Sequence, residues 1–399
     1  MVSRSGVRRA RLLDSSPDEV VPGPVWSAGC IRDAAAFAAL RPEWDALHDH
    51  CLGATPFSGH GWLSAWWAHY GDAGQRLRVV WVRRDGELVA AAPLLLRRRW
   101  GLRVLAAIGE GQSDYGDVLL HERWPGPAAE RLAAAVRDTP GWQVLQLSEV
   151  RPTAAAWRLV ATWPGARWEL PASVCLQIPG PAMEQLLAGL TSSGRHRIRG
   201  KLRRIDELGL REREVPSEEV PAAVGAMLEL HCRQWAGRGM NPEHGTARFR
   251  AFLAEAVAEL ARRGRAHVHE YRQGETLVAS DVLLTCPEFV GDYLNAAAPE
   301  LRARIDTASL CLRRNLALTA RLGVPLNLLR GQEDYKSRWR PEAATNRHLV
   351  LARSSSYGAC YVAALRGRRA VGNVVRRRRT GPRAGVRSTV GTAPERRTR

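Results

Sequence analysis

Lysine is almost missing from this sequence. Lysine and arginine together number 59, yet only Lys201 and Lys336 are lysines. A lysine kept where nearly every other cation is arginine is a candidate for a role that needs the compact, deprotonatable ammonium instead of the planar guanidinium; chance is the alternative. Lys336 lies in the most distinctive segment, residues 327–339, which reads Asn-Leu-Leu-Arg-Gly-Gln-Glu-Asp-Tyr-Lys-Ser-Arg-Trp.

Signals of several common site types are also missing. The seven cysteines are odd in number and scattered, without a Cys-x-x-Cys pair, which argues against a disulfide framework and against a zinc site. Gly-x-Ser-x-Gly motifs, Walker-type loops and metal-ligand clusters do not occur. We interpret His231, His267 and His269 as packing or surface residues. The sequence therefore predicts no metal site.

The chain lacks a long apolar run. The longest, Leu88 to Leu96, has about half of the ~18 residues that suggest a membrane span. The segment from Arg4 to Glu19 carries arginines and then acids, without the apolar stretch that a secretory signal requires. We therefore expect a cytoplasmic protein with reduced thiols.

What the sequence does contain is typical of a folded protein with a basic tail. Apolar residues make up 45% and charged residues 25% of the 399 residues, a composition that suits two soluble globular domains. The net charge is +19, and residues 366–399 supply +11 of it. We expect residues 354–399 to be disordered. Such a tail is either a solvated appendage or a weak attachment to nucleic acid or an anionic membrane.

The first half of the chain predicts helices followed by a sheet. Residues 34–50 carry apolar side chains at helical spacing. Two apolar runs flank the turn Asp85-Gly86, which is the signature of a β-hairpin. Residues 109–117 form a loop with three glycines and three acids. Such a loop either lets a ligand approach closely or is a structural turn. The remaining predicted elements are a helix at 127–137 and strands at 104–108, 118–120 and 143–147.

The second half repeats this order more clearly. Helical spacing in residues 192–208 puts four apolar residues on one face, and the opposite face is dense in arginine, either a solvated face or a contact for phosphates. Thr307 is placed to cap a helix that ends at Gly323. A short buried strand then leads into residues 327–339. The other predicted elements are helices at 181–190, 217–235 and 246–263 and strands at 266–271, 277–285 and 288–295.

Two helices, a three-stranded meander, a crossover helix, a further strand and a polar turn form the order of a GNAT-type acyltransferase domain. The segments that carry this resemblance are Trp62–Trp67, Gly111–Asp117, Leu230–Trp235, Gly323 and Arg330–Trp339. Together they resemble the CelD-like GNAT acetyltransferases of cellulose and exopolysaccharide synthesis, which are related to the FemABX transferases. The resemblance covers about Trp26 to Arg353.

The resemblance implies an α+β (mixed α/β) fold with two tandem GNAT-like domains, each a mixed sheet flanked by helices. The expected boundaries are a flexible N-terminus at 1–25, an N-terminal GNAT-like domain at 26–178, a C-terminal acyltransferase domain at 179–353, and the tail at 354–399. The implied reaction is transfer of an acyl group, from acetyl-CoA as donor, to a small-molecule, amino-sugar or saccharide acceptor.

Candidate catalytic residues follow from what this reaction needs. Glu333 is our candidate for the base that takes the proton of the acceptor, and Tyr335 for the donor of a proton to the leaving thiolate. Lys336 can hold a carboxylate, a phosphate or an oxyanion; a surface pair with Glu333 is the alternative. Asp281 is an acid inside a strand pattern, either functional or at a sheet edge facing water.

Binding residues are predicted around these groups. Tyr293 and Asn295 end a strand and can position the donor carbonyl or the acceptor. The other predicted substrate-binding residues are Asp114, Tyr115, Arg330 and Trp339. For the donor pyrophosphate, Arg302 and Arg304 supply charge, and Thr307 opens a helix whose N-terminus suits phosphate. The glycines that GNAT enzymes typically have at this helix start are replaced by Ile305 and Asp306.

Three functions remain open on the sequence. The first is a CoA-dependent N- or O-acyltransferase, which would serve polysaccharide or cell-envelope synthesis. The second is a FemABX-like transferase that uses aminoacyl-tRNA, which the basic face of residues 195–204 would suit. The third is a non-catalytic assembly factor for polysaccharide synthesis, or a protein that binds nucleic acid through its basic tail.

Overall fold

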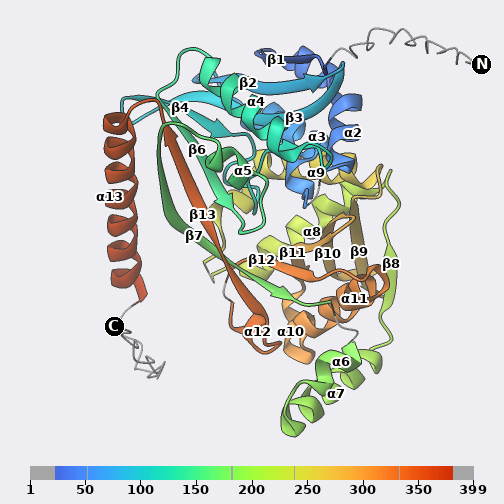
Figure 1. Cartoon of the computed structure of the whole chain (residues 1–399). Helices are drawn as coiled ribbons and strands as arrows, with labels where there is room; N and C mark the ends of the chain where they lie inside the picture. Colours follow the sequence, from blue (N-terminus) through green and yellow to red (C-terminus); the bar gives the residue numbers. More distant parts are fainter. Residues whose placement is uncertain (1–22, 52, 181–182, 238, 332, 381–399) are drawn as a thin grey trace, which may run out of the picture.

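One mixed sheet runs through both halves of the chain (Figure 1). The computed structural model describes residues 23–380 except 52, 181–182, 238 and 332. In these residues the strands follow the order β1-β2-β3-β4-β6-β13-β7-β12-β11-β10-β9-β8, and β5 pairs with β3 outside this path. Helices flank the sheet, so the predicted mixed α/β class is confirmed.

The predicted hairpin and the apolar face of residues 34–50 are confirmed in the first half, but that helix is divided at Leu40 into α1 and α2. Pro42 stands in the first turn of α2, where it has no N–H to continue the ladder of α1. The elements are β1 (Trp26–Ile31), α1 (Ala34–Ala39), α2 (Arg41–Asp49), η1 (Pro56–Ser58), α3 (His60–Tyr70), β2 (Gln75–Arg84), β3 (Glu87–Arg99), β4 (Leu102–Ala107), β5 (Leu119–Leu120), α4 (Pro125–Asp138), β6 (Val144–Val150), α5 (Ala156–Ala161) and β7 (Ala166–Ile178).

The second half has the predicted pair of helices, meander, crossover helix and strand. Gly323 ends α11 in the left-handed conformation, with φ 69°, as a glycine favours. The predicted cap is wrong by one residue, because Asp306 is the N-cap and Thr307 begins the helix. The elements are α6 (Met183–Ala188), α7 (Ser192–Asp206), β8 (Arg211–Glu214), α8 (Val220–Trp235), η2 (Pro242–Gly245), α9 (Ala247–Ala261), β9 (Ala266–Gln273), β10 (Thr276–Cys286), β11 (Phe289–Ala297), α10 (Pro299–Arg304), α11 (Thr307–Leu322), β12 (Leu326–Arg330), α12 (Asp334–Ser337), β13 (Glu342–Ala352) and α13 (Ser355–Thr380).

Two long strands link the halves. β7 pairs with β12 on one side and β13 on the other, and β13 also pairs with β6 of the first half. One hydrophobic cluster contains residues of α2 and α3 together with residues of α8 and α9. The sheet and the core are therefore continuous across residue 178, and the division into domains at that point stays a prediction.

Helix α13 corrects the prediction of a disordered tail from residue 354. Tyr361, Val362 and Leu365 are buried against the sheet, and Gly358 packs so closely on the ring of Trp168 that a Cβ would lie 1.9 Å from it. These apolar residues share one helical face, a pattern that the arginine-rich average of the tail concealed. Residues 381–399, and residues 1–22 of the predicted flexible N-terminus 1–25, lie outside the described residues.

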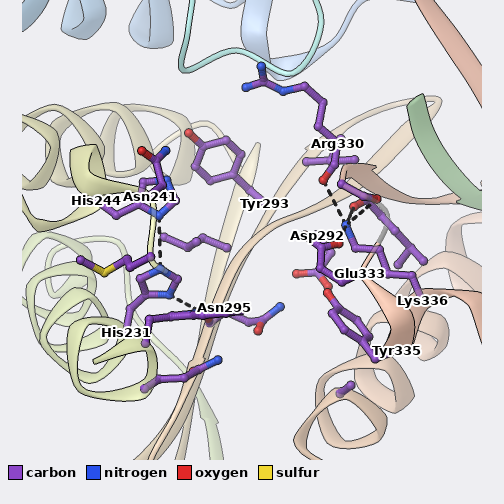
Figure 2. Close-up of a pocket in the computed structure, with 18 of the residues that line it drawn as sticks. His231, Asn241, His244, Asp292, Tyr293, Asn295, Arg330, Glu333, Tyr335 and Lys336 are labelled. Carbon is purple, nitrogen blue, oxygen red and sulfur yellow. Dashed lines mark hydrogen bonds and ion pairs between the residues drawn. The ribbon is translucent and has the colours of Figure 1, made fainter. Parts of the chain in front are cut away.

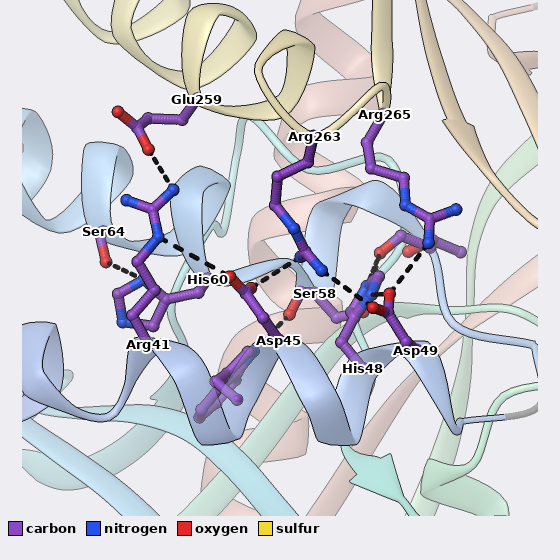
Figure 3. A network of polar contacts seen from close by, with 12 residues as sticks. Arg41, Asp45, His48, Asp49, Ser58, His60, Ser64, Glu259, Arg263 and Arg265 are labelled. Atoms are coloured by element: carbon purple, nitrogen blue, oxygen red, sulfur yellow. Dashed lines mark hydrogen bonds and ion pairs between the residues drawn. The ribbon is translucent and has the colours of Figure 1, made fainter.

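An ion-pair network joins α2 to the end of α9 and the start of β9 (Figure 3). Arg263 contacts Asp45 at 2.8 Å and Asp49 at 3.0 Å. Arg265 contacts the second oxygen of Asp49 at 2.9 Å. A hydrogen bond with His48, the largest effect, and these two arginines lower the pKa of Asp49 to about 2, although burial opposes the shift.

We expect Asp49→Asn to destabilise the fold in a pH-dependent way. Because the pKa of Asp49 is lowered on folding, its charge stabilises the protein above pH 4, and this contribution is lost as the pH falls toward 2. The carboxylate is partly exposed, so the effect at pH 6 should be at most about 1 kcal/mol. Urea unfolding of both proteins at pH 6, 4 and 3 measures it. Asp138→Asn, at an exposed position, is the control, and a loss independent of pH would contradict the prediction.

Candidate functional site

The main pocket opens where two parallel strands separate. β11 and β12 pair only at Val290 with Leu326 and at Gly291 with Asn327. Beyond these pairs the strands diverge around a cavity of about 730 Å³, lined by residues 292–295 on one side and 328–331 on the other. Backbone N–H and C=O groups on the two facing edges lose their ladder partners there, so they need side chains, water or a ligand as partners.

Most of the predicted site residues meet in this pocket. Those that line it are Asp114, Tyr293, Asn295, Arg302, Thr307, Arg330, Glu333, Tyr335 and Lys336. They come from the loop 109–117, from β11, from α10 and the start of α11, and from the end of β12 with α12. The residues predicted from the sequence therefore lie on both walls of the gap, although the separation of the two strands was not predicted.

Four predicted residues lie outside the pocket lining. Asp281 is fully buried on β10, where Nδ1 of His269 lies 3.0 Å from Oδ1, so it neither faces water nor touches a ligand in this pocket. Trp339 is buried in a hydrophobic cluster. Tyr115 is also buried, and its hydroxyl donates to Asn327 at 3.4 Å. Arg304 lines a smaller adjoining cavity. In each case the apolar neighbours or the strand direction, unseen in the sequence, decide the orientation.

A β-bulge sets the side chains of β11. The register against β10 shifts between Val282, paired with Leu294, and Leu283, paired with Asp292. Paired residues in an antiparallel ladder share a face, so the extra residue brings Asp292 and Asn295 to the same face of the sheet. In a regular strand these two residues, three apart, would point to opposite faces.

Asp292 is the functional candidate that sequence reasoning missed. Its Oδ1 is shielded from solvent and has no hydrogen-bond partner among the described residues. Burial, the largest effect, and the charge of Asp281 raise the pKa of Asp292 to about 7, against the opposing effects of Lys336 and Asn295. An acid in a pocket with this pKa is suited to general-base catalysis at neutral pH. The sequence did not indicate Asp292, because side chains alternate between the two faces of a regular strand and this alternation places Tyr293 and Asn295, not Asp292, on the pocket face.

Tyr335 lies beside Asp292 on the wall formed by α12 (Figure 2). Burial, then the charges of Asp292 and Glu333, raise the pKa of its hydroxyl above the ordinary value. Glu333 pairs with Lys336 at 2.8 Å. Gly331 lies next to it at φ 110°, a backbone conformation that favours glycine.

Lys336 is buried rather than part of a surface pair. Only 5% of the residue is exposed, and its ammonium donates to the carbonyl oxygens of Leu328 at 2.8 Å and Arg330 at 3.1 Å. These carbonyls belong to the edge of β12 that β11 no longer covers. The ammonium thus takes the place of the missing strand neighbour and supports the open gap.

The opposite wall carries two histidines that the sequence did not single out as functional (Figure 2). Nδ1 of His231 lies 3.2 Å from the carbonyl oxygen of Asn295, so this nitrogen holds the proton and donates. Its Nε2 accepts from Nδ1 of His244, at 3.2 Å. Burial lowers the pKa of His231, and burial and His231 lower that of His244 to about 4. Both rings are therefore neutral at pH 7.

Three residues of the loop 109–117, Gly111, Gln112 and Asp114, line the pocket, which is consistent with the interpretation that this loop lets a ligand approach. Arg330 pairs with Asp114 and donates to the carbonyl of Gly111 at 3.1 Å. Tyr293 donates to the carbonyl of Gln112 at 3.0 Å. Burial lowers the pKa of Arg330, but Asp114 outweighs this effect and the net pKa of Arg330 is raised. Burial also raises the pKa of Asp114, although Arg330 opposes this shift. The first half of the chain thereby closes one side of the pocket.

The far end of the pocket meets the N-terminus of α11. Thr307 and Ala308 line it together with Arg302 and Arg338. The first N–H groups of a helix have no acceptor within the helix, so this end of α11 attracts phosphate. No group of three potential metal ligands occurs among the residues that the structure describes. In the same part of the chain we find no helix with the length and apolarity of a membrane span.

Comparison with known families gives a match for the part of the chain that supplies most of the pocket lining. Residues 192–337 match the family model described as an acetyltransferase (GNAT) domain. This part of the chain is a GNAT-like acyltransferase domain. It contains both strands of the gap, the helix that ends it and the α12 wall. The loop 109–117, Ser173 and Arg338 are the lining residues from outside it.

Solved structures share the fold over most of the chain. A conserved protein of unknown function from Bacteroides thetaiotaomicron is similar with a TM-score of 0.51 and 12% identity, over 82% of this chain and 100% of that one. FemX is similar with a TM-score of 0.55 and 11% identity, over 77% of this chain and 95% of that one. At such identities the likeness shows the fold alone. No curated protein sequence gave a significant match.

Proposed function

We propose that this protein transfers an acetyl group from acetyl-CoA to an amine or hydroxyl of a saccharide or other small acceptor, in polysaccharide or cell-envelope synthesis of the CelD type. The observation that carries the proposal is Asp292, a shielded carboxyl group with a pKa of about 7, facing Tyr335 in a gap between two strands whose far end is a helix N-terminus. The GNAT-like domain supports the reaction class.

Asp292 accepts one proton in the reaction and Tyr335 donates another. As the acceptor nitrogen or oxygen bonds to the acyl carbon, the Asp292 carboxylate takes its proton. Free N–H groups on the strand edges beside the bulge stabilise the charge on the carbonyl oxygen. The C–S bond then breaks, and the thiolate takes the proton of Tyr335, whose raised pKa keeps it protonated until that moment. Return of the proton from Asp292 to Tyr335 resets the site.

The two ends of the pocket suit different partners. At the α11 end, the helix N-terminus with Arg302 and Arg338 suits the pyrophosphate of the donor. At the other end the lining is polar but uncharged, with neutral His231 and His244 beside Asn241 and Trp235. Neutral donors and acceptors next to an aromatic ring suit a hydroxyl-rich acceptor such as a sugar. Glu333 and Arg330 lie between these ends and can orient the reacting groups.

An aminoacyl-tRNA donor is a second candidate, favoured by one observation. The exposed face of α7 carries Arg197, Arg203 and Arg204 in a row of basic residues, and phosphate backbones bind to such faces. The fold likeness to FemX does not decide between the donors. Competition between acetyl-CoA and tRNA for binding distinguishes the two donors.

Calorimetric titration of the full chain with acetyl-CoA tests the proposal. We expect saturable binding that bulk tRNA does not displace, and about a tenfold loss of affinity in Arg338→Gln because a charged hydrogen bond to phosphate is lost. Arg321→Gln, in the last turn of α11, is the matched control and should bind normally. Displacement by tRNA would favour the second candidate, and no binding of acetyl-CoA would refute the first.

A further inference from the structure

A second, smaller cavity adjoins the α11 end of the pocket. It measures about 130 Å³ and is bounded by Lys201 and Arg204 from α7 and by Arg302 and Arg304 from α10, with Asp306 at its base. Arg302 and Asp306 line both cavities. A ligand that reaches the start of α11 can therefore extend into the smaller cavity. Figure 1 shows α7 and α10 at the same end of the molecule.

The charges around this cavity do not balance. Four cationic side chains surround a single carboxylate. Asp306 is held by Lys201 and, at 3.0 Å, by Arg338 from outside the cavity. Burial raises its pKa, but Lys201 and Arg338 outweigh this effect and the net pKa is lowered, so its single negative charge is retained. Lys201, Arg204 and Arg304 by themselves still outnumber this carboxylate in the lining, so the cavity favours an anion.

The side chains of the lining favour a phosphate group as the anion. Arginine forks bind phosphate through two parallel hydrogen bonds, and lysine adds a point charge. Arg204 is exposed, and the hydrogen bond of Arg304 to Gln273 is long, 3.5 Å. Both guanidinium groups can reorient toward a phosphate without breaking a strong pair. A dianionic phosphate neutralises more of this charge than a carboxylate does.

We propose that Lys201, Arg204, Arg302 and Arg304 form a subsite for a second phosphate group of the donor, separate from the pyrophosphate at α11. The inference rests on the proposed function. In acetyl-CoA this group is the ribose 3′-phosphate; a nucleic-acid donor supplies the same chemistry through its backbone. The subsite therefore distinguishes acetyl-CoA from its 3′-dephospho form, which the main pocket alone cannot do.

Binding of acetyl-CoA and acetyl-3′-dephospho-CoA to the full chain tests the subsite. We expect the wild type to prefer acetyl-CoA by about 10- to 100-fold, as two charge-assisted hydrogen bonds predict. Arg204→Gln/Arg304→Gln should bind both ligands with the affinity that the wild type has for the dephospho form. These two side chains lie on the surface, and thermal melting checks that the variant is folded. Arg197→Gln/Arg203→Gln removes the same charge outside the cavity and should keep the preference.

The outcomes separate this inference from the proposed function. Equal affinity of the wild type for the two ligands, with saturable binding, overturns the subsite and leaves the acyltransferase proposal intact. If acetyl-CoA does not bind at all, the proposed function fails, and fluorescently labelled bulk tRNA becomes the probe. tRNA binding that is weaker in the Arg204/Arg304 variant than in the Arg197/Arg203 variant supports the subsite. Equal weakening in both double variants, or none, overturns it.

Discussion

Replacing Asp292 by asparagine is expected to lower kcat for acyl transfer by about 10²- to 10⁴-fold. The amide keeps the shape of the side chain but cannot accept the proton of the acceptor. In the wild type, kcat/KM should rise with pH and level off above an inflection near 7, because the base must be deprotonated to act and its pKa is about 7. Steady-state rates from pH 5.5 to 9 measure both effects, and the inflection should vanish in the variant.

Two neighbouring acids are the controls for Asp292. Glu333→Gln should change kcat far less, since Glu333 is already paired with Lys336. Asp281→Asn should move the inflection to lower pH, because the charge of Asp281 raises the pKa of Asp292. The other groups that act on Asp292 or share its face are Lys336, Asn295, Tyr335 and Cys311. A Glu333→Gln variant as inactive as Asp292→Asn would assign the base to Glu333 instead.

The second large effect is on stability. Lys336→Met is expected to lower the free energy of unfolding by about 3 kcal/mol. Methionine can fill the buried space of the lysine stem, but the carbonyl oxygens of Leu328 and Arg330 then lose their donor, and each unsatisfied buried group costs about 1 to 3 kcal/mol. Urea unfolding of the full chain at pH 7 measures the change.

The only other lysine provides a matched control. Lys201 pairs with Asp306 and is about a quarter exposed, so Lys201→Met should cost at most about 1 kcal/mol. A similar loss in both variants would show that the backbone contacts of Lys336 do not matter. The scarcity of lysine thus pointed to one residue with a distinct environment: besides the expected pair with Glu333, Lys336 donates to two backbone carbonyls that the sequence did not indicate.

Local patterns were enough for the hairpin of the first half and for most elements of the second half. The Asp-Gly turn at 85–86 and the glycine at 323 act through backbone conformations that few other residues adopt, so they mark a hairpin and a helix end in any context. Helical and strand spacing of apolar residues then gave α9, α11 and the three-stranded meander. β7 and β13 were not predicted, because their pairing joins residues far apart in the chain.

The sequence by itself determined the class of fold, the order of elements around the gap and the membership of most of the pocket lining. Those features depend on local periodicity and on a motif that lies at one strand end. Only the tertiary structure decided which acid faces the gap. One extra residue in β11 turns Asp292 toward Tyr335, and the α11 side buries Asp281 with His269 and Asn315. Register and burial depend on strands that are distant in sequence, so no local pattern could assign them.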